Sequence, residues 1–457
     1  MSNLKLKFCG GVGSVTGANF LLTDGKIQIL VDCGLEQGSV EKGVMDPNRA
    51  PFPYNPKEID FLFVTHAHAD HIGRIPKLVK DGFRGKIFST PNTYEISKVM
   101  FEDAVKINER EAKEHDMEPN YIQADANQAI SLWNTIEYHT DFQLNEDFKI
   151  HLKDAGHILG SAIVEITYLP ENKKIAFTGD LGNSPTPLIR DAEFVTDADY
   201  LVMESVYGNR NHEDKENRKT KLRSFIHRII ERKGTLLIPV FSLEKTQVIL
   251  HEMNEMIEGG QVKSVPVFLD SPLGIKLTEI YAQQFAAFNE KVQARILSGD
   301  QIFDFPKLYM TDSVKESDRI HQIDGPKIIL AGAGMSTGGR IMEHEKRYLA
   351  DPKNGILFIG FQVAGSLGRQ ILERSRSVRI NGETVYVKAE VEVINGYSSH
   401  MDSDHLVEFV GHTAEKVKKV FCVMGEPQTA MFLAQRLRDE WGVNAVHPTE
   451  GETVELK

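Results

Sequence analysis

The segment Thr65–His71 (THAHADH) places three histidines and an aspartate within six residues, directly after the apolar run Phe61–Val64. Such a run predicts a buried strand, so these side chains lie where the strand ends. Imidazole nitrogens and carboxylate oxygens are the donors that zinc-like ions prefer, and burying so many polar groups without partners is costly. A surface cluster without a ligand is the alternative. The pattern favours a metal site with the candidate ligands His66, His68, Asp70 and His71.

Short apolar runs alternate with longer amphipathic stretches along the whole chain. Examples of the runs are Ile27–Val31, Leu201–Met203 and Lys327–Leu330. This alternation predicts an α/β fold and argues against a β-sandwich or a helical bundle. A length of 457 residues fits two domains with long insertions. No apolar run approaches the roughly 18 residues that a membrane-spanning helix needs, so no membrane partner is expected.

Two changes in the sequence suggest domain boundaries. A charged segment, Asn209–Arg232, follows Gly208, and a strand-like run ends near Asn395–Gly396. We therefore predict one domain built from residues 1–208 and 396–457, with a second domain, 209–395, inserted into it.

The net charge of −12 would ordinarily disfavour a nucleic-acid partner. Over 209–395, however, 27 Lys and Arg stand against 24 Asp and Glu, and the acidic excess lies in the rest of the chain. A mildly basic middle domain is compatible with a polyanionic ligand. The start of the chain does not resemble an export signal, and there are only three cysteines. We therefore expect reduced thiols and a cytoplasmic location.

Two further polar residues stand at predicted strand ends beside glycines. They are His157, in Gly156-His157, and Asp180, in Gly179-Asp180. Alone, each could simply form a turn. Together with the histidine cluster they could complete two adjacent metal sites, with Asp180 bridging ions about 3.5–4 Å apart. Asp32 ends an earlier strand, where it either orients a metal ligand or forms a turn.

These motifs resemble the signature of the metallo-β-lactamase fold, and others narrow the resemblance to its β-CASP family. Met203–Gly208 (MESVYG) is similar to β-CASP motif A, with Glu204 as its acid, and Tyr397–Asp402 (YSSHMD) is similar to motif B. The resemblance spans nearly the whole chain, and its motifs come in family order. Three more segments look like β-CASP landmarks: Leu269–Pro272, Gly334–Arg340 and Gly360–Gly368.

The resemblance implies an αββα metallo-β-lactamase sandwich with an inserted β-CASP α/β domain. It also implies a zinc-dependent ribonuclease, similar to the cleavage and polyadenylation endonuclease, that hydrolyses single-stranded RNA by two-metal catalysis in a cleft between the domains. The first zinc site is implied to comprise His66, His68, His157 and Asp180, and the second Asp70, His71 and Asp180. The resemblance does not decide whether cleavage is internal or starts from the 5′ end. A homodimer is possible.

The resemblance also implies that His400 donates a proton to the leaving group. Glu204 would orient the His400 imidazole and favour its protonated form. The implied catalytic residues are thus Asp70, Glu204 and His400. Without the family pattern, His400 would be interpreted as a helix cap and Glu204 as a surface acid after a strand.

The chain departs from the family at motif C, where a histidine is expected as a ligand of the second metal. The matching stretch, Phe421–Glu426 (FCVMGE), has Met424 instead. A thioether is a soft, neutral and weak ligand, better matched to Cu(I) than to zinc. We therefore expect the second zinc site to be weaker than the first. His447 is a poorer candidate substitute, since ligand geometry rarely tolerates a different strand.

The glycine-rich segment Gly332–Arg340 precedes a helical stretch, Ile341–Leu349, and could seat a phosphate at the helix N-terminus. Alternatively, its glycines serve backbone freedom alone. The candidate substrate contacts are Ser336, Arg340, Ser366 and Ser399.

Three rival functions remain. Gly334–Gly338 satisfies G-x-S-x-G, which would make Ser336 the nucleophile of a serine hydrolase, but this leaves the histidine cluster without a role. An RNA-binding paralogue could have lost nuclease activity through Met424. A metal-dependent hydrolase of small molecules is also compatible with the fold, although the large inserted domain disfavours it.

Overall fold

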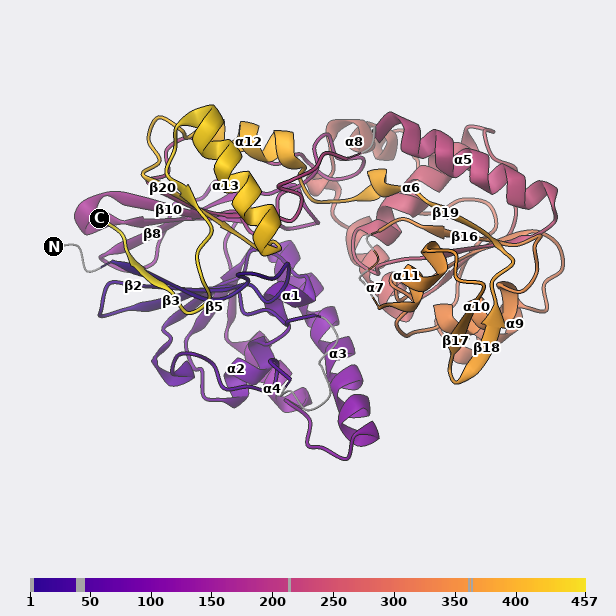
Figure 1. Cartoon of the computed structure of the whole chain (residues 1–457), viewed down its shortest axis with the longest axis horizontal. Coiled ribbons are helices and arrows are strands. Elements are labelled where there is room, and N and C mark those ends of the chain that lie inside the picture. Colours follow the sequence, from indigo (N-terminus) through magenta and orange to yellow (C-terminus); the bar gives the residue numbers. More distant parts are fainter. Residues whose placement is uncertain (1–3, 38–45, 213–214, 361, 363–364) are drawn as a thin grey trace. The chain divides into compact units, whose positions relative to one another are not determined.

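The computed structural model describes residues 4–37, 46–212, 215–360, 362 and 365–457. Their contacts divide the chain into two compact units (Figure 1). The first unit contains the chain up to Asn211 together with His400–Lys457, and the inserted unit is His212–Ser399. The domain boundaries near 208 and 395 remain proposals.

The first unit contains two seven-stranded mixed sheets. In spatial order, the first sheet consists of β22 (Thr453–Glu455), β1 (Lys5–Gly10), β2 (Asn19–Thr23), β3 (Gln28–Val31), β4 (Phe61–Phe63), β5 (Lys86–Ser89) and β6 (Trp133–Thr135). The second consists of β21 (Ala445–Val446), β20 (Lys419–Val423), β11 (Tyr200–Glu204), β10 (Lys173–Phe177), β9 (Ala162–Tyr168), β8 (Phe148–Asp154) and β7 (Phe142–Gln143).

Aromatic and aliphatic side chains from both sheets form one core. Strand β8 alternates buried and half-buried residues, as expected of a strand with one face in a core. Ring centroids of Phe8 and Phe421 lie 5.1 Å apart, and those of Phe20 and Phe177 lie 6.2 Å apart. Since each pair joins a strand of one sheet to a strand of the other, the two sheets pack face to face.

Helices cover the outer faces of this sandwich (Figure 1). On the side of the first sheet lie α1 (Ala69–Ile72), α2 (Ile75–Lys80), α3 (Pro91–Glu114) and α4 (Gln123–Ser131). Apolar residues of α12 (Ser403–Gly411) and α13 (Pro427–Trp441) pack on the second sheet in a separate core. Short 3-10 helices are η1 (Pro56–Glu58) and η2 (Leu169–Glu171). This arrangement is the predicted αββα sandwich.

The inserted unit is built on a parallel six-stranded sheet, whose central strands are fully buried apolar runs. Its spatial order is β14 (Leu308–Met310), β13 (Val267–Asp270), β15 (Lys327–Ala331), β12 (Thr235–Pro239), β16 (Gly355–Phe358) and β19 (Glu390–Val393). A separate hairpin pairs β17 (Ser377–Ile380) with β18 (Glu383–Tyr386).

The helices of the inserted unit are α5 (Lys215–Glu231), α6 (Lys245–Glu258), α7 (Pro272–Ala282), α8 (Glu290–Leu297), α9 (Val314–Ile320), α10 (Ile341–Tyr348) and α11 (Leu367–Leu372), with the 3-10 helices η3 (Phe285–Ala287) and η4 (Asn395–Tyr397). Among all the residues described, no helix combines the length and apolar character that crossing a bilayer requires.

Candidate metal centre

The predicted metal ligands stand on loops at the ends of strands in the first unit. His66 and His68 follow β4, His157 lies between β8 and β9, and Asp180 follows β10. In each case an apolar strand ends in a short polar turn, which brings residues distant in sequence to one edge of the sandwich. His66, His157 and Asp180 are at most 2% exposed.

The structure brings His66, His68, His157 and Asp180 together. Each offers one ligand atom, and these atoms all lie within 4.8 Å of one another. His68 Nδ1 is 3.0 Å from His66 Nε2 and 3.2 Å from His157 Nε2, and Asp180 Oδ2 lies 3.4 and 3.5 Å from those two nitrogens. For zinc bonds of about 2.0–2.1 Å, the corners of a tetrahedron are about 3.3 Å apart. The spacing and chemistry of the four donors fit a zinc ion.

The protonation of these histidines also suits metal binding. Burial lowers the pKa of His66, His68 and His157, and nearby imidazoles lower it further. Neutral imidazole is the form that binds metal ions, so these rings are ready to act as ligands. Burial acts to raise the pKa of Asp180, but His71 and His400 hold it well below its usual value, so Asp180 stays ionised.

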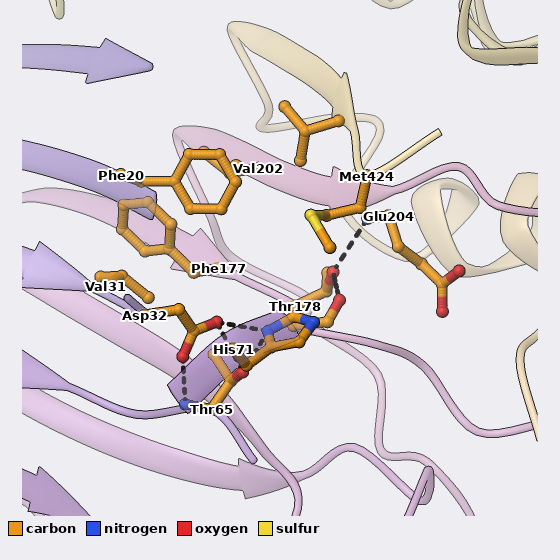
Figure 2. A pocket seen from close by; sticks show the side chains of 12 residues that line it. Phe20, Val31, Asp32, Thr65, His71, Phe177, Thr178, Val202, Glu204 and Met424 are labelled. Carbon is orange, nitrogen blue, oxygen red and sulfur yellow. Dashed lines mark hydrogen bonds and ion pairs between the residues drawn. The ribbon is translucent and has the colours of Figure 1, made fainter. Parts of the chain in front are cut away.

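Asp32 fixes the orientation of His71. Its Oδ2 accepts a hydrogen bond from His71 Nδ1 at 2.7 Å. The Thr65 backbone N–H donates to Oδ1 at 2.8 Å, and the Thr65 hydroxyl donates to Oδ2 at 2.7 Å. Figure 2 shows these bonds. Because Nδ1 is used in this way, Nε2 of His71 is the nitrogen left to face Asp180.

The position predicted for a second metal ion contains two buried atoms without hydrogen bonds in the described part of the chain. They are His71 Nε2 and Asp180 Oδ1, 3.4 Å apart. The two atoms are at ion-pair distance from each other. Despite burial, which acts to lower it, the carboxylates of Asp180 and Asp32 raise the pKa of His71 well above its usual value. A cation bound between them would take the place of the imidazole proton. Asp180 thus directs Oδ2 toward the first group and Oδ1 toward His71, as a bridging carboxylate would.

The second position has fewer ligands than the first. Of the ligand groups found among the described residues, neither includes Asp70 or His71. Met424 is buried, with a positive φ of 49°, and lines a cavity of about 10 Å³ together with Asp32 and His71 (Figure 2). His447 belongs to neither ligand group found among the described residues, and its Nδ1 is hydrogen-bonded to the Cys422 carbonyl oxygen at 3.0 Å.

Glu204 and His400 lie beside this centre. His400 Nδ1 is 3.3 Å from Glu204 Oε2 and 3.9 Å from Asp180 Oδ2. Glu204 is fully buried, and its Oε1 accepts the Leu181 N–H at 2.6 Å. Burial raises the pKa of Glu204, while His400 acts to lower it. With Asp180, the pair forms a second set of potential ligand atoms.

The predicted substrate contacts lie in the inserted unit. Ser336 is fully buried and its hydroxyl donates to the Glu345 carboxyl, whose pKa burial raises to about 8. This removes the support for a serine hydrolase, whose nucleophile must be exposed. Arg340 donates to Asp270 at 2.7 Å.

Ser366 caps α11 by accepting the Arg369 N–H, and Ser399 is half-buried. In this structure Ser336, Arg340 and Ser366 therefore hold their own loops, and a role in binding substrate stays a prediction.

Thr65 is a site residue that the sequence did not reveal. Besides binding Asp32, its hydroxyl lies 3.1 Å from His66 Nδ1 and 3.3 Å from His71 Nδ1. Its position directly before the histidine cluster was the one available signal, and threonine at a strand end is too common to be diagnostic.

Models of three domain families match the sequence. The beta-lactamase superfamily domain matches residues 28–216 and the Beta-Casp domain matches 246–371. The Zn-dependent metallo-hydrolase RNA specificity domain matches 384–448.

Among characterised proteins, Ribonuclease TTHA0252 of Thermus thermophilus is 33% identical over 94% of each chain. Transcription termination factor FttA of Methanosarcina mazei is 30% identical over 98% of this chain and 71% of its own. A crystal structure of a protein of unknown function from Enterococcus faecalis V583 has the same fold, with a TM-score of 0.60 and 12% identity over 99% of this chain and 100% of that one.

Proposed function

The chain belongs to the metallo-β-lactamase superfamily, in the branch that carries a β-CASP domain and an RNA specificity domain, and from this we propose that it is a zinc-dependent ribonuclease acting on single-stranded RNA. The observation that carries the proposal is the spacing of His66, His68, His157 and Asp180. A relative similar over almost the full chain is named a ribonuclease, which supports RNA as the substrate.

Hydrolysis of a phosphodiester needs a nucleophile at neutral pH and relief of the negative charge on the phosphate. Zinc supplies both when bound, as a Lewis acid. The chain's own contribution is to present neutral imidazoles and an ionised Asp180 in a preset arrangement. Asp32 adds to this by directing Nε2 of His71 toward Asp180.

His400 is placed to serve as the general acid for the departing sugar oxygen. Glu204 engages Nδ1 of His400, so Nε2 is the nitrogen that can deliver a proton. A buried carboxylate beside an imidazole favours the protonated ring, which is the form that donates. Such proton transfer typically contributes about 10²–10⁴-fold to the rate.

The proposal is tested with the purified chain and end-labelled single-stranded RNA. We expect a chelator to abolish cleavage and added zinc to restore it. His157→Asn should lower both zinc content and rate, because it removes one of four grouped donors. His115→Asn is the matched control, since His115 is exposed at the end of α3. Cleavage that persists in chelator, or equal zinc content in the two variants, would overturn the proposal.

Met424 favours a second candidate function, an RNA-binding protein with little nuclease activity. A thioether that lines the same cavity as His71 offers a zinc ion a weak ligand in place of an imidazole. We propose that wild type retains about one zinc per chain and that Met424→His raises the content toward two. Histidine suits the positive φ at this position better than most residues do.

Zinc per chain and RNA cleavage are measured for wild type, Met424→His and a control, Met431→His. Met431 is 52% exposed on α13, so the same substitution there leaves the centre untouched. We expect only Met424→His to gain zinc, with affinity for the second ion rising about 10-fold or more, and to cleave faster. Equal zinc content in wild type and Met424→His would refute this account. RNA binding without cleavage at any zinc concentration would instead support the non-catalytic function.

A further inference from the structure

Three residues of the inserted unit form a buried charged network. The Tyr397 hydroxyl, in η4, donates to Oε2 of Glu252, in α6, at 2.5 Å. Arg218, in α5, donates to Oε1 of the same carboxylate through Nε at 3.2 Å and Nη2 at 2.9 Å. Glu252 is fully buried and Tyr397 is 5% exposed. Both carboxylate oxygens are therefore used, and the tyrosine side chain is held at its tip.

The same network also holds the backbone around Tyr397. Arg218 Nη1 donates to the Gly396 carbonyl oxygen at 3.2 Å, and Lys245 Nζ donates to the Tyr397 carbonyl oxygen at 2.8 Å. The Arg218 guanidinium lies 5.1 Å from the centre of the Tyr397 ring. We call Arg218, Lys245, Glu252 and Tyr397 the Tyr397 clamp. Because buried ion pairs add little net stability, the role considered for this network is to fix one conformation of the chain.

The clamp lies immediately before His400 in the sequence. The inserted unit ends at Ser399 and the first unit resumes at His400. At about 3.3–3.6 Å per residue, the three steps from Tyr397 to His400 span at most about 11 Å. Beyond them, His400 forms an isolated bridge with Gly182, and the Met401 N–H donates to the Leu181 carbonyl oxygen at 2.8 Å. The segment that joins Tyr397 to His400, which we call the tether, is therefore short.

We propose that the Tyr397 clamp is a positioning device for His400, an inference that rests on the ribonuclease function proposed above. The clamp restrains Tyr397 within the inserted unit, three residues before His400, and the Glu204 carboxylate contacts the His400 imidazole within the first unit. Loosening the clamp lets the His400 imidazole move away from the position from which it delivers a proton. A displacement of about 1 Å can cost about 100-fold in rate. In this proposal the clamp residues act through His400 and not by contact with substrate.

The test is Tyr397→Phe, which removes the hydroxyl and leaves Glu252 Oε2 without that donor. We expect kcat to fall between about 10- and 100-fold, while KM for RNA and zinc content stay at wild-type values. The control is Tyr281→Phe. The Tyr281 hydroxyl also donates to a buried glutamate, Glu244, at 2.6 Å in the same unit, but Tyr281 is more than a hundred residues from His400. The control should keep kcat within about twofold of wild type, because it leaves the tether untouched.

Equal kcat losses in Tyr397→Phe and Tyr281→Phe would overturn the inference, since a general loss of stability would then suffice. A rise in KM at unchanged kcat would overturn it as well. If Tyr397→Phe does not fold, Lys245→Met is the second variant, because it removes only the hydrogen bond to the Tyr397 carbonyl oxygen. It should lower kcat in the same way, with KM and zinc content unchanged. An inactive wild type would refute the ribonuclease proposal itself. An active wild type with an unaffected Tyr397→Phe refutes only the clamp.

Discussion

At the scale of single residues, Asp32 shows how a carboxylate outside the ligand set can organise the centre. It is 1% exposed, has a positive φ of 60°, and accepts hydrogen bonds from both the backbone and the hydroxyl of Thr65 and from His71 Nδ1. A residue that merely formed a turn would not require a negative charge. The three donors support the interpretation that Asp32 orients His71.

Asp32→Asn should therefore weaken zinc binding about 10- to 100-fold. Asparagine tolerates the positive φ but has one acceptor oxygen where the carboxylate has two, so the donors of Thr65 and His71 cannot all be satisfied. Competition with a chromophoric chelator measures the affinity. Asp24→Asn is the control, because Asp24 is also buried and accepts backbone N–H groups, those of Lys26 and Ile27, which a single amide oxygen can still accept. Equal zinc affinities in the two variants would contradict the role of Asp32.

At the scale of elements, the loop before β2 and the loop after β3 both pack backbone to backbone against α1. The Cys33 N–H donates to the His71 carbonyl oxygen at 2.8 Å, and the Ala18 N–H donates to the Asp70 carbonyl oxygen at 3.0 Å. A Cβ added at Gly34 would lie 1.6 Å from that same Asp70 oxygen. Glycine is required here by close approach, and this contact fixes the helix that carries Asp70 and His71.

We expect Gly34→Ala to lower the free energy of unfolding by about 1–3 kcal/mol and to reduce zinc affinity, since α1 must shift. Urea unfolding with and without zinc measures both effects. Gly338→Ala is the control, because a Cβ there meets no atom within 4 Å. Unfolding and zinc binding like those of wild type in Gly34→Ala would show that α1 can move without consequence.

Several elements were predictable because buried parallel strands are continuous apolar runs. The predicted run Lys327–Leu330 corresponds to β15 (Lys327–Ala331), and the predicted helical stretch Ile341–Leu349 corresponds to α10 (Ile341–Tyr348). The fold class followed from the alternation of such runs with amphipathic stretches and from the family motifs. The four-residue helix α1 is too short to leave a periodic pattern, so its presence within the histidine cluster could not be predicted from periodicity.

At the scale of the whole molecule, contacts between residues distant in sequence determine where side chains lie, and local sequence patterns do not predict these contacts. Strand β22, near the C-terminus, pairs with β1, and the Met424 N–H donates to the Gly11 carbonyl oxygen at 2.7 Å. The sequence could name Met424 as a departure from the family pattern, but not the cavity it lines. Likewise, Ser336 stands in a glycine-rich segment that could seat a phosphate, and the tertiary structure reveals that its side chain is fully buried.

Glu204 joins two parts of the centre through one carboxylate. It accepts the N–H of Leu181, the residue after Asp180, and it faces His400. A substitution at 204 would therefore disturb both the loop that follows Asp180 and the side chain of His400, the proposed proton donor. Substitutions at positions 180, 204 and 400 should therefore show strong epistasis. A directed-evolution library meant to change the rate should vary the surrounding loops and keep these three side chains constant.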